Sequence, residues 1–260
     1  MTQKIIGNLQ IADFTLDLNL FFLSEILISD TATATIGRMH VCSGTSADYT
    51  VTLPAASGNT GKLIGFRMSN ALTKLVTLDG SASETIDGSL TRVMWKDEVA
   101  ILRCDGSNWA KIAGKSIPMG CTIRRSSDQT GVVTSTVTLV DFNQTDGDNT
   151  GAMADLTNNR ILIKRPGTYI VSGVVVWSGL TANSVRCITD IRKNGTGIAF
   201  AETSALSGGY TAPYCTDGPI LAAGDYLDMT GFHQCGSNQS MYGGATGGAT
   251  KLAAVEVPEW

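Results

Sequence analysis

The chain has 260 residues, a formal net charge of −4 and only 16% charged side chains, against about 25% in an average globular domain. With 43% hydrophobic residues it is too apolar for a disordered chain, and it lacks the basic excess that would favour nucleic acid as a partner. So few charges indicate that much of its surface is covered in an oligomer or a larger assembly.

The cysteines and histidines do not follow a metal-binding pattern. Six cysteines are scattered without a C-x-x-C pair, and His40 and His233 are the only histidines. That spacing disfavours a zinc site. We therefore predict no cofactor and expect the thiols to be small core hydrophobes.

We expect neither a secretory signal nor a membrane span near the N-terminus. Lys4 is followed by Asp13 rather than by a continuous apolar region and a cleavage site. The most apolar stretch, residues 18–28, is interrupted by polar side chains and is too short to cross a bilayer. The sequence therefore predicts no membrane insertion.

Residues 1–35 form an apolar N-terminal segment. Its apolar side chains alternate at Phe14, Leu16, Leu18 and Leu20, and such a segment has little to bury against on its own. We expect it to dock on its own copies or on another protein, and so to anchor the chain. An equally strong alternative is an ordinary first strand with a short helix of the next domain.

The rest of the chain has the pattern of short strands joined by tight turns. Asp-Gly pairs such as Asp87-Gly88 and Asp105-Gly106 lie between runs rich in Val, Ile, Thr and Leu, which is typical of hairpin turns. We predict an all-β protein. A linker at residues 114–118 divides a small β-module, residues 36–117, from a second β-domain, residues 118–260.

Four pieces of the second domain follow the order of a known jelly-roll family. They are an apolar strand with a Pro-Gly turn at 161–171, an Asn-Gly hairpin at 190–195, a Leu-x-x-Gly-Asp strand entry at 221–227 and a closing strand at 251–257. The domain resembles the complement globular-head and tumour-necrosis-factor-like jelly roll, although a Gly-rich tail departs from that family. The resemblance implies a sandwich head that packs as a homotrimer.

One strand of this domain, residues 168–177, is apolar on both faces. Such a strand is covered on both sides, and in a sandwich only one side can meet the opposing sheet. We therefore predict that it lies in the trimer interface, through Tyr169, Val171, Val174, Val176 and Trp177. The alternative is that a loop or the first domain covers the second face.

The module at residues 36–117 carries a second ordered set of motifs. A Val-x-Leu-Pro run ends at Pro54, a Gly-x-x-Ile run follows at 61–64, then Ile86-Asp87-Gly88, and finally an Asp-Gly-x-x-Trp run that ends at Trp109. The module resembles one that recurs in bacteriophage tail-fibre, tailspike and other virion appendage proteins. Pro54 lacks the amide that a strand ladder needs, and we expect Trp109 to close a small core.

Together the two resemblances imply a structural virion protein. It would be a trimeric tail or head fibre, assembled in the bacterial host cytoplasm, that contacts other virion proteins through residues 1–35. Its head would bind a host-surface glycan or protein receptor during host attachment. Two alternatives stay open: a capsid or head-fibre decoration protein without a receptor role, and a carbohydrate-active depolymerase.

No catalytic pattern stands out, and we predict that the protein is not an enzyme. Neither a complete P-loop nor a Gly-x-Ser-x-Gly elbow is present. Glycan cleavage would need paired carboxylates, for which Asp97 with Glu98 and the group Asp141, Asp146 and Asp148 are the candidates. We predict no metal site, with Asp146 and Asp148 as weak candidates for calcium.

Two segments rich in Gly, Ser and Asn carry the candidate ligand-binding residues. Sites for sugars combine aromatic faces with hydroxyl and amide groups, and loops at one end of a sandwich commonly carry them. The alternative is ordinary surface loops with a few packed aromatic side chains. The candidates are Tyr210, Tyr214, Phe232, His233 and Tyr242.

Overall fold

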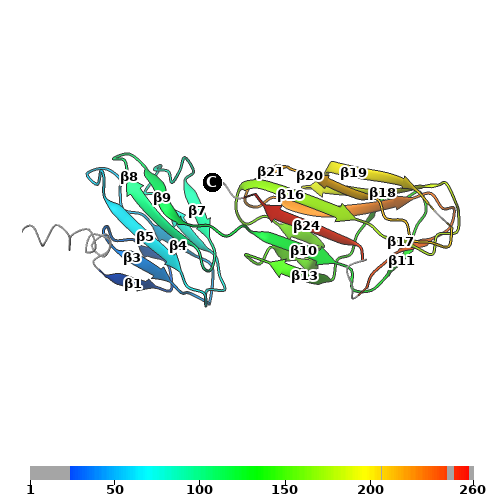
Figure 1. Ribbon diagram of the computed structural model, residues 1–260, viewed down its shortest axis with the longest axis horizontal. Helices are drawn as coiled ribbons and strands as arrows, with labels where there is room; N and C mark the ends of the chain where they lie inside the picture. Colours follow the sequence, from blue (N-terminus) through cyan, green and yellow to red (C-terminus); the bar gives the residue numbers. More distant parts are fainter. Residues whose placement is uncertain (1–23, 206, 245–248, 258–260) are drawn as a thin grey trace, which may run out of the picture. The chain divides into compact units, whose positions relative to one another are not determined.

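The computed structural model describes residues 24–205, 207–244 and 249–257, which divide into two compact units between Ile117 and Pro118. The described residues contain strands and a single short 3-10 helix, Leu156–Asn158, so the chain is all-β (Figure 1). None of its described helices has the length and hydropathy needed to cross a membrane. Phe14, Leu16, Leu18 and Leu20 lie outside the described residues.

The first unit is built from two sheets between which the chain alternates. The first three strands of each sheet pair in parallel, and the later strands return antiparallel. One sheet has the order β1 (Glu25–Ile28), β3 (Met39–Cys42), β5 (Leu63–Met68), β8 (Val99–Cys104), β9 (Trp109–Lys115). The other has the order β2 (Ala32–Thr33), β4 (Tyr49–Thr52), β6 (Val76–Asp79), β7 (Thr91–Met94).

The described part of the N-terminal segment belongs to this unit. β1 pairs with β3 and β2 pairs with β4, and Ile28 and Ala34 are buried in the same core as the later strands. A boundary at residue 35 therefore does not separate residues 24–35 from the β-module. Of the two interpretations of residues 1–35, the described part fits an ordinary first strand.

Three of the module motifs meet in the first unit. The Trp109 amide donates to the Thr85 carbonyl at 2.9 Å, and the Asp87 amide donates to the Trp109 carbonyl at 3.0 Å. The Trp109 indole is 1% exposed, and its Nε1 donates to the carbonyl of Pro54 at 3.2 Å. The tryptophan thus closes the core beside Pro54, two residues after the end of β4.

The second unit is a jelly roll. Counted in chain order, its eight main strands are β10 (Gly120–Arg124), β15 (Arg160–Leu162), β16 (Gly167–Val174), β18 (Arg186–Lys193), β19 (Thr196–Ser204), β20 (Tyr214–Asp217), β22 (Tyr226–His233) and β24 (Lys251–Glu256). The first, eighth, third and sixth form one sheet, and the second, seventh, fourth and fifth form the other. That order is the jelly-roll order of two Greek keys.

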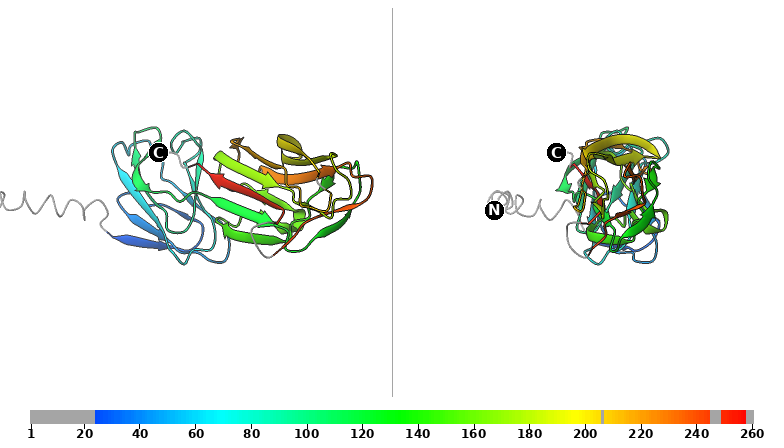
Figure 2. Two further views of the ribbon diagram at one scale, coloured as in Figure 1. Left: turned by 45° about the vertical axis from the view of Figure 1, so that its right-hand side comes forward. Right: turned by 90° about the vertical axis from the view of Figure 1, so that its right-hand side faces the viewer.

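Shorter strands extend both sheets and close one end of the sandwich (Figure 2). We call the sheet of β10, β24, β16 and β20 the inner sheet, and the sheet of β15, β22, β18 and β19 the outer sheet. β13 (Gln144–Asn149) and β21 (Ile220–Leu221) join the inner sheet; β12 (Thr138–Leu139) and β14 (Ala154–Asp155) join the outer sheet; β11 (Gln129–Val132), β17 (Trp177–Ser178) and β23 (Gln239–Met241) form a small third sheet.

The two main sheets pack closely against each other. Gly173 of β16 lies so near the outer sheet that a β-carbon there would stand 2.7 Å from the Met229 sulfur and 3.0 Å from Ile191 Cγ1. Tyr169 and Val171 of the same strand are fully buried on this side. The core of the head thus lies between β16 on one side and β18 and β22 on the other.

Candidate functional site

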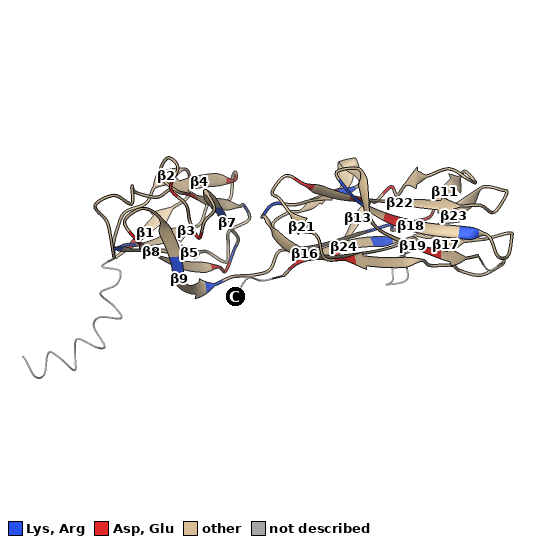
Figure 3. Cartoon of the chain, turned by 90° about the horizontal axis from the view of Figure 1, so that it is seen from above, with Lys and Arg blue, Asp and Glu red and all other residues tan. Residues whose placement is uncertain are grey.

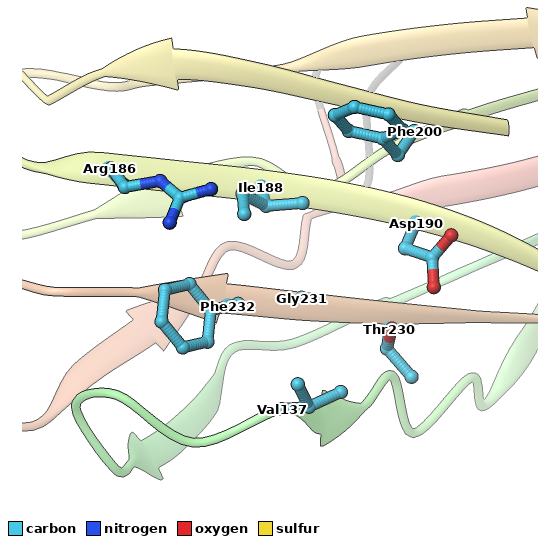
Figure 4. Close-up of a pocket in the computed structure, with 8 residues that line it drawn as sticks. All are labelled: Val137, Arg186, Ile188, Asp190, Phe200, Thr230, Gly231 and Phe232. Atoms are coloured by element: carbon cyan, nitrogen blue, oxygen red, sulfur yellow. The ribbon is translucent and has the colours of Figure 1, made fainter. Parts of the chain in front are cut away.

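A shallow groove of about 460 Å³ runs over the outward face of the outer sheet (Figure 4). The antiparallel registers put its side chains in two rows. Asp190 of β18 lies opposite Phe200 of β19 and Thr230 of β22, and Ile188 lies opposite Phe232. Its lining is Val137, Arg186, Ile188, Asp190, Phe200, Thr230, Gly231 and Phe232.

The walls of the groove are mainly apolar and accessible to solvent. The Phe200 side chain is 70% exposed, that of Val137 is 63% exposed, and Phe232 and Ile188 are half-buried. Large apolar side chains held together on a surface are characteristic of binding sites rather than of solvent-facing sheets. The arrangement can therefore contact the apolar face of a ligand.

Most charges near the groove neutralise one another. Arg186 binds Glu202 through two hydrogen bonds of 2.8 Å. Arg192 binds Asp228 in the same bidentate way, at 2.7 and 2.9 Å. Each of these two pairs has a net charge of zero, so Asp190 sets the net charge of the groove.

Asp190 is the one carboxylate in the groove lining. Within the described residues 24–205, 207–244 and 249–257, it makes neither a hydrogen bond nor an ion pair. Its side chain is half-buried and lies between Phe200 and Thr230 (Figure 4). Partial burial raises the pKa of this carboxyl, Arg192 lowers it and Asp228 raises it. The groove thus carries one negative charge that is not matched from within the fold.

A second surface lies on the outward face of the inner sheet. Ile170 of β16 is 57% exposed and lies opposite Val255 of β24, and Ser172 lies opposite Ala253 in the next row. Tyr214 of the edge strand β20 is 59% exposed beside Val174. Figure 3 shows that most of the strand length in the second unit carries no charged residue.

The predicted interface residues fall on both faces of β16 and beyond its end. Tyr169, Val171 and Trp177 are fully buried between the sheets of one chain, and Val176 is 7% exposed. The prediction that these four residues form the trimer interface is therefore wrong, because a side chain that fills the core of its own chain has no surface left to contact another chain. Val174 alone of the predicted set lies on the half-exposed outward face.

The predicted ligand-binding aromatics do not form a single site. Phe232 lines the groove, while Tyr214 lies on the inner sheet and Tyr210 packs edge-to-face on Tyr242 at 5.2 Å. His233 is fully buried; its Nε2 is 3.0 Å from the Val132 carbonyl, and burial lowers the pKa of its imidazole. His233 therefore cannot contact a ligand, which corrects that assignment.

Among the candidate catalytic carboxylates, Glu98 and Asp141 make contacts within the fold. Glu98 is buried and accepts hydrogen bonds from the amides of Trp95 at 2.8 Å and Ile117 at 2.7 Å. Asp97, beside it, is exposed at a turn with a φ of 64°. An ion pair of 3.2 Å joins Asp141 to Arg125.

Asp146, the one calcium candidate whose side chain is described, is also ion-paired. Its Oδ1 is 3.3 Å from Arg124 Nε, and the side chain of Asp148 lies outside the described atoms. Across residues 24–205, 207–244 and 249–257, no group of three or more His, Cys, Asp or Glu side chains could hold a metal ion. All six cysteines are buried.

The similarity of this chain to known proteins is one of structure and not of sequence. No protein-family model matches the sequence, and no curated protein matches it. Among solved structures, the chain is similar to Eiger TNF from S. frugiperda, at a TM-score of 0.40 and 8% sequence identity, over 55% of this chain and 94% of that one. The jelly-roll assignment rests on the strand order given above.

Proposed function

We propose that the protein is a non-enzymatic virion appendage, a homotrimer in which the outward faces of three inner sheets pack together. The exposed apolar side chains of Ile170, Val255 and Tyr214 on this one face of the inner sheet are the observation that carries this proposal. Apolar surface of this kind is stabilised when a partner removes it from water. A second copy fits because 16% charged residues leave the chain few charges to keep such a face solvated.

The groove remains open in such an assembly. It lies on the outer sheet, whereas the exposed apolar side chains lie on the inner sheet, on the opposite side of the same sandwich. Packing through one face therefore leaves the other accessible. We propose that the groove binds a host-surface glycan, and that three copies bind together with an avidity well above that of one.

The N-terminal end of the first unit supplies the attachment to the particle in this proposal. Among the described residues, β1 and β2 are the edge strands of their sheets, and exposed sheet edges readily accept strands from other chains. The motifs shared with phage appendage modules support a place on a virion assembled in a bacterial host. Other virion proteins are then the partners of residues 1–35.

Adsorption to host cells tests the proposal. We expect the purified chain to bind cells of the true host and to compete with intact virions for adsorption. Virions that lack the protein should adsorb poorly.

Three results would contradict this function. Normal adsorption without the protein would support a decoration role. Failure of the purified chain to bind host cells would remove the receptor role. Release of reducing ends from host polysaccharide would support the depolymerase alternative.

A further inference from the structure

The groove on the outer sheet has features that narrow the kind of glycan it can take. We infer that it binds a glycan containing a hexosamine with a free, protonated amino group, whose ammonium pairs with Asp190 while the sugar ring covers Phe200. This inference rests on the proposed glycan-binding function and makes it more specific. Three observations lead to it.

The first observation is the position of the carboxylate relative to the aromatic ring. Asp190 and Phe200 are direct cross-strand partners, and side chains so placed have β-carbons about 5 Å apart. Figure 4 shows the carboxylate beside the ring and above Thr230. An ammonium at this point would meet a carboxylate and an aromatic face together, and both attract cations.

The second observation is the charge balance. The guanidinium groups of Arg186 and Arg192 are already bound by Glu202 and Asp228. Asp190 is left as the unmatched charge of the groove lining, so the groove favours a cation over a neutral or anionic ligand. A glycan with carboxylate or phosphate groups would instead be repelled here.

The third observation is the apolar continuation of the groove. Ile188 and Phe232 form the next row along the strands, about 7 Å from the Asp190 row, since residues two apart on one strand face the same side. A second ring of an oligosaccharide can contact this row while the first lies over Phe200. The volume of about 460 Å³ falls within the range of small-ligand sites.

The test compares two oligosaccharides that differ only in the amine. Calorimetric titration of the full chain should show that the glucosamine tetramer binds about tenfold or more tightly than the N-acetylglucosamine tetramer, the range expected of a charge-assisted contact. Asp190→Asn should abolish this ratio. Phe200→Ala should weaken both ligands, and Asp30→Asn, at an exposed carboxylate of the first unit, should change neither.

Two measurements on the wild-type protein test the inference even if the variants fail to fold. High salt screens exposed charges, so it should weaken binding of the glucosamine tetramer and leave the acetylated tetramer nearly unchanged. Lowering the pH through the raised pKa of Asp190 should weaken the same ligand. Arg192 on β18 and Asp228 on β22 are the charged groups that act on Asp190, and its partner on β19 is the uncharged Phe200.

Four results would overturn this inference. They are equal affinity for the two tetramers, preference for the acetylated tetramer, an unchanged ratio in a folded Asp190→Asn protein, and no binding of either tetramer. If the same protein still adsorbs to host cells, the glycan-binding function survives and only the amine specificity is lost. If it does not adsorb either, the proposed function fails as well.

Discussion

Ile170 and Val255 lie directly opposite each other on β16 and β24, and both point away from the core of the head. They are 57% and 48% exposed in a single chain. A pair of large aliphatic side chains in the middle of a sheet is normally covered by another part of the chain or by a partner. In the proposed trimer, neighbouring copies cover this pair.

A charge at this position should separate the copies without unfolding them. Ile170→Asp places a carboxylate in the contact, at a cost of about 3 kcal/mol or more per copy. The dissociation constant should therefore rise at least about a hundredfold, as analytical ultracentrifugation would measure. Val133→Asp, at a valine that is 49% exposed outside the inner sheet, is the control and should leave the assembly intact.

Val176→Asp distinguishes an interface from a core position. Val176 is 7% exposed, and its amide donates to the Thr250 hydroxyl at 3.0 Å. We expect this variant to unfold the head, because an unpaired charge inside one chain is costly. A folded Val176→Asp protein that has only lost its partners would contradict the burial described here.

The last strand of the head is held by a buried ion pair. Glu256 Oε1 accepts from Arg165 Nε at 2.8 Å, and Glu256 Oε2 accepts from the Met119 amide at 2.9 Å. Both charged side chains are nearly buried, at 12% and 11% exposure. Removing one partner of such a pair typically costs about 3–5 kcal/mol.

Glu256→Gln should therefore lower the free energy of unfolding by about that amount in urea titrations followed by circular dichroism. The exposed pair of Arg186 and Glu202, at 53% and 38% exposure, offers the matched comparison. Glu202→Gln should cost about 1 kcal/mol or less. An equal loss in the free energy of unfolding for the two variants would show that the buried pair of Arg165 and Glu256 stabilises the head no more than an exposed pair does.

Gly231 of β22 leaves room for the ring of Trp177. A β-carbon at this position would stand 2.8 Å from Trp177 Cζ2 and 2.7 Å from the Met241 methyl carbon. Overpacking of this kind costs about 1–3 kcal/mol, so Gly231→Ala should lower the melting temperature. Gly218→Ala, where nothing lies within 4 Å, should melt like the wild type.

Asp225 makes the stability of the head depend on acid pH. Its carboxylate binds Lys193 at 2.9 Å and accepts from the Ala222 amide and the Asn194 side chain, and these contacts lower its pKa to about 2. A folded-state pKa below the ordinary value of 3.8 stabilises the fold above about pH 4, and this stability is lost as the pH falls towards 2.

Thermal unfolding at a series of pH values would measure this contribution. Asp225→Asn should be less stable than the wild type at pH 7, and its stability should fall less steeply between pH 4 and 2. Parallel curves for the two proteins over that range would contradict the assignment.

The order of the head strands could be predicted because turn and strand motifs are local. The Asn194-Gly195 pair has φ angles of 51° and 80° and joins β18 to β19, as Asn-Gly pairs do in hairpins. The faces of β16 could not be predicted in the same way. When both faces of a strand are apolar, alternation separates the faces but does not indicate which one meets the opposing sheet.

The groove could not be predicted, because it depends on the pairing register of β18 and β19, which the sequence does not specify. A regular hairpin from Lys193 and Thr196 would place Asp190 opposite Ala199, but an irregularity between Ile191 and Arg192 shifts the pairing by one and brings Phe200 there. Such bulges commonly re-aim side chains. The parallel pairing of the first three strands in each sheet of the first unit could not be predicted for a related reason. The composition of a strand does not give the direction in which it pairs.

The mass of the purified full-length chain in solution tests the central claim most directly. Sedimentation equilibrium at micromolar concentration should give three times the 27.3 kDa of one chain, with a mass that falls towards one chain on Ile170→Asp substitution. A well-folded wild-type protein that sediments as a single chain would contradict the trimer and the appendage built on it.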